Sequence, residues 1–193
     1  DDVEVMAFSM QLLFTTLVGM ALIAAVGALL GVLKYALAAV ITTSMLRIFS
    51  GGAHATSPWR CIAFGGVIFP ALGLLTKGVE PYLHTEILLF GIAFTAVFAF
   101  WSVWSYAPAD TPGKPINATV QKTRLRRLSI GLVLIWTVLM IVSLKAWFWH
   151  ITPAFLAAST LGLLWQAFTL TTAGYAMVNK VDSLVGGLVF GRR

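Results

Sequence analysis

The chain has a single cysteine, Cys61, and charged residues occupy only 10% of its 193 positions. One cysteine cannot form an internal disulfide, which excludes a disulfide-stabilised secreted domain and leaves the thiol free for packing or chemistry. So few charges cannot cover the surface of a soluble domain of this length. Hydrophobic residues instead make up 59% of the chain, and its mean hydropathy is +0.91. The composition indicates an integral membrane protein.

Apolar runs long enough to cross a bilayer predict an all-α, polytopic membrane protein with about six transmembrane helices. Residues 6–46 would form a helix of about 60 Å, roughly twice the hydrocarbon thickness, so we predict two helices with a break near Gly27, Gly31 and Lys34. Four further spans are predicted at residues 61–76, 87–106, 128–149 and 153–178. We expect one domain over residues 1–193, with the natural N-terminus missing because the first residue is Asp.

Basic residues gather in alternate loops, which predicts the orientation in the membrane. The loop between the fourth and fifth spans is the most basic and should be cytoplasmic; it carries Lys114, Lys122, Arg124, Arg126 and Arg127. Counting spans outward places both termini and the segment from His54 to Cys61 on the cytoplasmic side. The formal net charge of +6 is therefore explained mainly by basic residues in the loops that are predicted to be cytoplasmic. Nothing beyond that charge suggests binding of nucleic acid.

Two groups capable of nucleophilic catalysis stand close together, His54 after a glycine pair and Cys61 seven residues later. On a continuous helix they would lie about 10.5 Å apart, too far for proton transfer, so the chain must fold back between them. Gly51-Gly52 permits such a turn, and Ser57-Pro58 is typical of a helix start. Cys61 is then expected in the first helical turn, where the helix dipole and Arg60 favour a thiolate.

In this arrangement His54 would be the general base for Cys61, and backbone N–H groups at the helix start would stabilise the oxyanion. Asp110 and Asp182 are the acidic residues expected on the same face, and Asp110 is the candidate to orient the imidazole. The residues alone leave a second interpretation open, in which the cysteine packs or is acylated and the histidine is solvated. No cluster with metal-ligand spacing occurs, so neither a metal nor a cofactor is predicted.

Two separate motifs resemble the accessory gene regulator B (AgrB) family of bacterial quorum-sensing endopeptidases. The first is the run Arg47-Ile48-Phe49-Ser50-Gly51-Gly52-Ala53-His54-Ala55 with Cys61 beyond it. The second is Tyr106-Ala107-Pro108-Ala109-Asp110-Thr111, continuing to Lys114-Pro115-Ile116 and a basic cluster. The similarity covers most of the chain, with six spans in the same order.

This resemblance implies that the protein cuts the C-terminal part from an AgrD-like signal propeptide at a bacterial cell membrane. The N-terminal fragment would be held as a thioester on Cys61 and passed to an internal cysteine or serine, yielding a cyclic thiolactone or lactone peptide. By matching position, His54 is the base, Arg47 and Gly52 support activity, and the residues assisting the substrate are Lys122, Arg124, Arg126 and Arg127.

Other functions remain compatible with the sequence. The main alternative is a small peptide exporter or membrane scaffold without enzymatic activity, in which the glycine segment is a gate. A peptidase that only hydrolyses its substrate is another. Membrane lipid is an expected partner, and glycine-containing helix faces are compatible with a homodimer.

Overall fold

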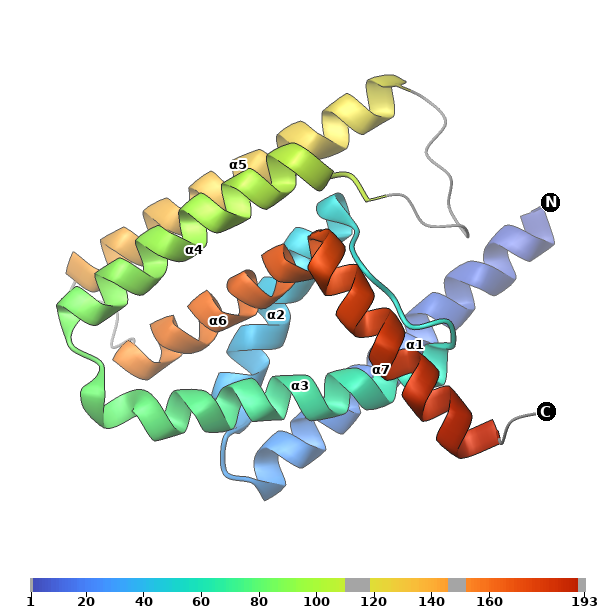
Figure 1. Ribbon diagram of the computed structural model, residues 1–193, viewed down its shortest axis with the longest axis horizontal. Helices are drawn as coiled ribbons and strands as arrows, with labels where there is room; N and C mark the ends of the chain where they lie inside the picture. The colour runs from blue at the N-terminus through green and yellow to red at the C-terminus, as the bar shows by residue number, and fades with distance from the viewer. Residues whose placement is uncertain (1, 110–118, 146–151, 191–193) are drawn as a thin grey trace.

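The computed structural model describes residues 2–109, 119–145 and 152–190, which form helices and connecting segments without any strand (Figure 1). The helices are α1 (Asp2–Leu29), α2 (Leu33–Ser50), α3 (Pro58–Val79), the 3₁₀ turn η1 (Glu80–Tyr82), α4 (Thr85–Tyr106), α5 (Thr119–Lys145), α6 (Pro153–Leu170) and α7 (Thr172–Phe190). The predicted all-α fold of a polytopic membrane protein is confirmed.

Within the described residues, five segments are long and apolar enough to cross a membrane, and they correspond to the second to sixth predicted spans. They are Leu33–Ser50, Pro58–Tyr82, Thr85–Tyr106, Thr119–Leu144 and Pro153–Leu170. The apolar part of α1 is shorter, Leu13–Leu29, so a sixth span remains a prediction. The predicted fifth span begins earlier than expected, at Thr119, and its residues 146–149 lie outside the described part of the chain.

The predicted break between the first two helices is confirmed at residues 30–32. Gly31 adopts a φ of 66°, a left-handed conformation that glycine tolerates and that ends α1. Gly27 lies against the next helix, since a Cβ there would be 3.2 Å from the Cα of Leu33. The absence of a side chain at Gly27 therefore allows α1 and α2 to meet closely at their turn.

The prediction of one continuous span over residues 153–178 is wrong, because the helix breaks at Thr171. Thr171 is extended, with ψ of 160°, and its hydroxyl donates to the Phe168 carbonyl at 2.8 Å. The same hydroxyl accepts from the Gly174 N–H at 3.1 Å, so one threonine ends α6 and begins α7. Hydropathy cannot detect such a break, because apolar residues continue on both sides of Thr171.

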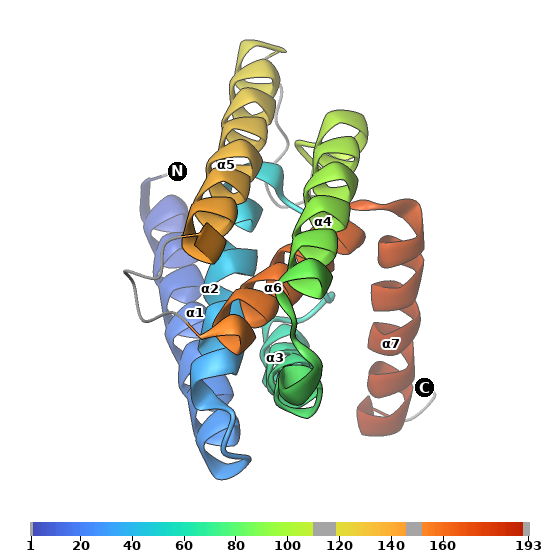
Figure 2. The same cartoon turned by 90° about the vertical axis from the view of Figure 1, so that its left-hand side faces the viewer.

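Helix α6 is enclosed by the rest of the bundle and lies between α2 and α4 (Figures 1 and 2). Gly162 packs against the Ala39 backbone, and its carbonyl accepts from the Thr43 hydroxyl at 2.7 Å. On the other side, the Trp136 indole of α5 donates to the Ser159 hydroxyl at 2.9 Å. These contacts fix the middle of α6 against α2 and α5.

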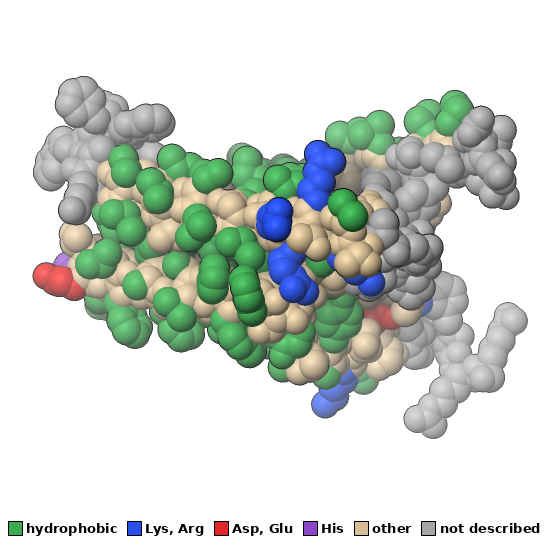
Figure 3. Space-filling model, turned by 90° about the horizontal axis from the view of Figure 1, so that it is seen from above, with side chains coloured by type: hydrophobic (Ala, Val, Ile, Leu, Met, Phe, Trp, Pro, Cys, Tyr) green, Lys and Arg blue, Asp and Glu red, His purple; other side chains and the backbone are tan. Residues whose placement is uncertain are grey.

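Apolar side chains cover much of the outer surface, as expected for helices that face lipid (Figure 3). On the face shown, Lys and Arg side chains lie in the right-hand half, while an acidic group marks the left end. The acidic residue Glu80 follows α3 and accepts from the Tyr35 hydroxyl at 2.9 Å near the start of α2. A second acidic group lies in the right-hand half of the same view, and Lys77 lies near Gly31, in the turn before α2, so acidic and basic side chains occur at both ends and the predicted cytoplasmic face stays a prediction.

Candidate active site

Residues 51–57 connect α2 to α3 and carry His54; we call this segment the strap. Gly51 and Gly52 have φ angles of 68° and 138°, which strongly favour glycine. A Cβ on Gly51 would also lie 2.5 Å from the Ala109 carbonyl oxygen, because the chain after α4 passes beside it. The glycine pair therefore ends α2 and turns the chain back toward α3, as the sequence predicted.

Helix α3 begins at Pro58, with Ser57 at the N-cap position as expected, although the serine side chain makes no capping bond. Cys61 is half-buried in the first turn, and its N–H donates to the Ser57 carbonyl at 3.0 Å. Because that N–H is already paired, it is not free to bind an oxyanion. Donors for an oxyanion must come from earlier positions in the turn, such as the N–H groups of Trp59 and Arg60.

Arg47, in the last turn of α2, links the strap to the bundle. Its guanidinium donates through Nη2 to the Ala53 carbonyl and through Nη1 to Gln166 Oε1, the latter at 3.3 Å. Its charge also interacts electrostatically with Cys61 and with His54. The arginine thus anchors the strap at Ala53, the residue before His54, while a catalytic pair of His54 and Cys61 stays a prediction.

The His54 imidazole lies exposed on the strap, yet the segments around it remove part of its hydration. This burial, and secondarily the positive charge of Arg47, lowers the pKa of His54 to about 4. The imidazole is therefore neutral at pH 7 and able to accept a proton. It makes no hydrogen bond to another described residue, and Asp110, the residue expected to orient it, lies outside the described residues.

The second half of the strap is held by Asp182, a buried residue of α7, which runs alongside the strap in Figure 1. Its Oδ2 accepts from the Thr56 hydroxyl at 2.7 Å and from the Thr56 N–H at 3.3 Å. Its Oδ1 pairs with Arg60 Nη1 at 3.1 Å. Asp182 thus supports the backbone between His54 and Cys61, a role that depends on the break at Thr171.

The first half of the strap is held by α6, through residues that sequence reasoning missed. The Ala53 N–H donates to the Thr169 carbonyl at 3.1 Å. A Cβ on Gly52 would lie 3.2 Å from both Gln166 Nε2 and Thr169 Oγ1, so the strap backbone is packed directly on these side chains. One signal was available in the sequence, since Gln166 is the only amide side chain in the apolar run of α6.

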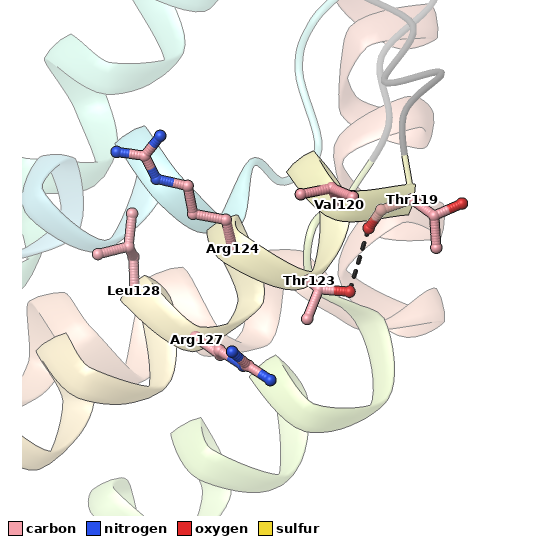
Figure 4. Close-up of a pocket in the computed structure, with 6 residues that line it drawn as sticks. All are labelled: Thr119, Val120, Thr123, Arg124, Arg127 and Leu128. Carbon is pink, nitrogen blue, oxygen red and sulfur yellow. Dashed lines mark hydrogen bonds between the residues drawn. The ribbon is translucent and has the colours of Figure 1, made fainter.

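The predicted substrate-binding cluster lies at the start of α5, and its three arginines are exposed. Arg126 Nε donates to the Ala107 carbonyl at 2.8 Å and so supports the segment after α4. Arg124 and Arg127 point away from each other and help to line a hollow of about 450 Å³ (Figure 4), whose remaining lining residues are Thr119, Val120, Thr123 and Leu128. Since neither His54 nor Cys61 lines this hollow, binding of substrate there stays a prediction separate from the strap.

No set of three or more His, Cys, Asp or Glu side chains that could hold a metal ion occurs among the residues the structure describes. The chemical groups gathered at the strap are a thiol, a neutral imidazole and a guanidinium. These groups can supply a nucleophile, a proton acceptor and a fixed positive charge.

Comparison with known proteins points to one family. The family model described as "Accessory gene regulator B" matches residues 1–170. An AgrB-like protein of Clostridium perfringens (strain SM101 / Type A) is 29% identical over 190 residues, covering 96% of this chain and 89% of that protein. Accessory gene regulator protein B of Staphylococcus aureus (strain MRSA252) is 30% identical over 148 residues, covering 77% of this chain and 71% of that protein. No solved structure gives a significant match. The chain is therefore a membrane protein of the accessory gene regulator B family.

Proposed function

We propose that this protein is a membrane cysteine endopeptidase that cleaves an AgrD-like signal propeptide and promotes its cyclisation. The observation that carries the proposal is the position of Arg47, whose guanidinium donates to the carbonyl of Ala53, the residue before His54 in the segment that leads to Cys61. If Cys61 only packed against its neighbours and His54 were only solvated, the segment between them would not require Arg47 to hold it in place.

The proposed reaction begins with attack of Cys61 Sγ on the carbonyl carbon of the scissile peptide bond. Neutral His54 accepts the thiol proton, and free N–H groups in the first turn of α3 bind the oxyanion. When the intermediate collapses, the C–N bond breaks, and His54 returns the proton to the leaving amine. The products are a thioester on Cys61 and a released C-terminal fragment.

In the second half of the reaction, a cysteine or serine of the bound fragment attacks the thioester carbonyl. His54 takes the proton of the attacking group and transfers it to the departing Cys61 sulfur, which restores the enzyme. A thiolactone or lactone forms without addition of water, so ring closure must outpace hydrolysis. A strap at the membrane edge suits this need, because substrate and thioester would be partly shielded from water.

The exposed arginines at the start of α5 suggest how the substrate is held. The resemblance to the family implies a propeptide with an acidic C-terminal tail, and Arg124 and Arg127 present positive charge at the same end of the bundle as the strap. We infer that this surface attracts the tail, and that both lie on the cytoplasmic side of a bacterial membrane.

The proposal is tested by producing the full chain in bacteria with the short reading frame next to its gene, followed by mass spectrometry. We expect a peptide fragment attached to Cys61, the only cysteine to which a thioester can be assigned, and a cyclic product one water lighter than the linear fragment. A linear product would overturn the cyclisation step. Intact exported peptide without any adduct would instead support an exporter.

The low pKa of His54 predicts how activity depends on pH. The neutral imidazole is the form of His54 that acts as the base. Because its pKa is about 4, below the usual histidine pKa of 6.5, His54 stays neutral as the pH falls below 6.5. We expect the acid limb of the profile of kcat/KM against pH, which protonation of His54 sets, to lie near pH 4. The rates are measured on the protein in lipid nanodiscs with a synthetic propeptide. His84→Gln, changed at the start of α4, is the control and should leave the profile unaltered. A His54-dependent limb above pH 6 would contradict this prediction.

A further inference from the structure

Gln166 occupies the contact between α6 and the strap, and its side chain is fully buried. Its Nε2 donates to the Gly51 carbonyl at 2.7 Å and to the Ser50 hydroxyl at 3.2 Å. Its Oε1 accepts from Arg47 Nη1 at 3.3 Å, while the single proton of the Thr169 hydroxyl goes to the Gln166 backbone carbonyl at 2.8 Å. The amide therefore contacts the end of α2, the start of the strap and the arginine that serves both candidate catalytic residues.

The chemistry of these partners fixes the orientation of the amide. Arg47 can only donate, so the oxygen of Gln166 must face it, whereas the Gly51 carbonyl can only accept, so the NH₂ group must face the strap. Both donors of the amide are used, and its oxygen accepts from Arg47. A carboxylate would lose both donors, and an apolar side chain of the same length would lose all three hydrogen bonds.

The place of Gln166 in the bundle suits a rigid support. The helix that carries it is buried along most of its length and packs against α2 and α4. The strap has no regular structure of its own, and a Cβ on Gly52 would lie 3.2 Å from Gln166 Nε2, leaving the strap backbone little room to shift. The buried helix α6 thus supports the irregular strap through one side chain that both donates and accepts hydrogen bonds.

We propose that Gln166 is a positioning residue of this site, which holds the Arg47 guanidinium against the Ala53 carbonyl and fixes the start of the strap that carries His54 toward Cys61. The inference rests on the function proposed above and assigns a role to a residue outside the motifs that identify the family. Gln166 touches no reacting atom. It acts by keeping the Arg47 guanidinium directed toward Ala53, and by fixing the backbone two residues before Ala53 at Gly51.

Two variants of the full chain in nanodiscs test this role. Gln166→Met keeps the approximate length and volume but removes every hydrogen bond, while Gln166→Glu keeps an acceptor for Arg47 and loses the donors to the strap. For Gln166→Met we expect kcat per folded protein to fall about 10- to 100-fold, with KM changed less than about threefold. Gln166→Glu should lie between Gln166→Met and the unaltered protein. Thr160→Val is the matched control, because that buried hydroxyl of α6 bonds only to the Leu156 carbonyl of its own helix.

A second measurement does not depend on the propeptide. Since Cys61 is the only thiol, its rate of alkylation by iodoacetamide at pH 7 reports its environment directly. We expect this rate to fall about three- to tenfold in Gln166→Met and to remain unchanged in Thr160→Val. If only the melting temperature falls, while kcat and alkylation of the folded protein stay within twofold of normal, Gln166 is merely structural and the proposal is wrong. If Gln166→Met does not fold, Gln166→Glu decides by the same criteria. Processing that survives in Cys61→Ala would overturn the proposed function instead, and alkylation would still test whether Gln166 controls the environment of Cys61.

Discussion

Replacement of Cys61 by alanine is expected to abolish propeptide processing, with a fall of at least about 10³-fold in turnover. The physical reason is that no other thiol exists in the chain, so the covalent intermediate cannot form elsewhere on cysteine. Cys61 is only half-buried, so removing its sulfur should leave the fold intact. The measurement is the amount of cyclic product, together with the mass of the intact protein.

Two controls separate loss of chemistry from loss of structure. Ala63→Ser changes an exposed neighbour in α3 and should retain processing. Cys61→Ser leaves a hydroxyl in place of the thiol and should be almost as inactive as Cys61→Ala, because His54 must then deprotonate a far weaker acid. Normal turnover in the folded Cys61→Ala protein would show that Cys61 is not the nucleophile.

Replacement of Arg47 should have the second largest effect, roughly 100-fold in kcat for Arg47→Lys. An ammonium cannot reproduce the fork that reaches both the Ala53 carbonyl and Gln166 Oε1, and each lost contact to a charged donor costs about 1.5–3 kcal/mol. Arg47→Met should be worse still, because it also removes the charge that interacts with Cys61. Turnover per folded protein is the quantity to measure.

The Arg47 variants also make a prediction about pH. The charge of Arg47 is the second cause of the low pKa of His54, after burial, so its removal in Arg47→Met should raise that pKa toward 6.5. The acid limb of the kcat/KM profile should move to higher pH in Arg47→Met and much less in Arg47→Lys. Lys34→Met, at the opposite end of α2, is the matched control and should change neither rate nor profile. An unshifted limb in Arg47→Met would mean that the arginine does not act on His54.

The local features of the site were predictable because they depend on residues close together in sequence. Glycine at 51 and 52 indicated a turn, and Pro58 indicated the start of a helix, so the place of Cys61 in the first turn could be predicted. The contact between Arg47 and the strap was not predictable in the same way. It joins residues six positions apart whose distance depends on the path of an irregular segment.

The supports of the strap were missed for a different reason. Gln166 and Thr169 lie more than 110 positions beyond Arg47, and only helix packing brings them to it. Asp182 is one of the two acidic residues that the sequence places on the same face as the strap, but the predicted helix over residues 153–178 does not indicate which residues it would contact. The break at Thr171 turns α7 alongside the strap and brings Asp182 to Thr56 and Arg60.

The sequence alone determined the class of the protein, the approximate positions of most of its membrane spans and the residues available for chemistry, because these follow from composition, apolar run length and a single thiol near a histidine. The tertiary structure alone decided which groups surround that pair. Packing of α2 against α6 brings Gln166 and Thr169 to Arg47 and the strap, and the break before α7 brings Asp182. The physical reason is that turns and helix ends depend on residues that are close together in sequence. Buried hydrogen bonds instead form wherever packed helices bring donors and acceptors to face each other, and these residues can be far apart in sequence.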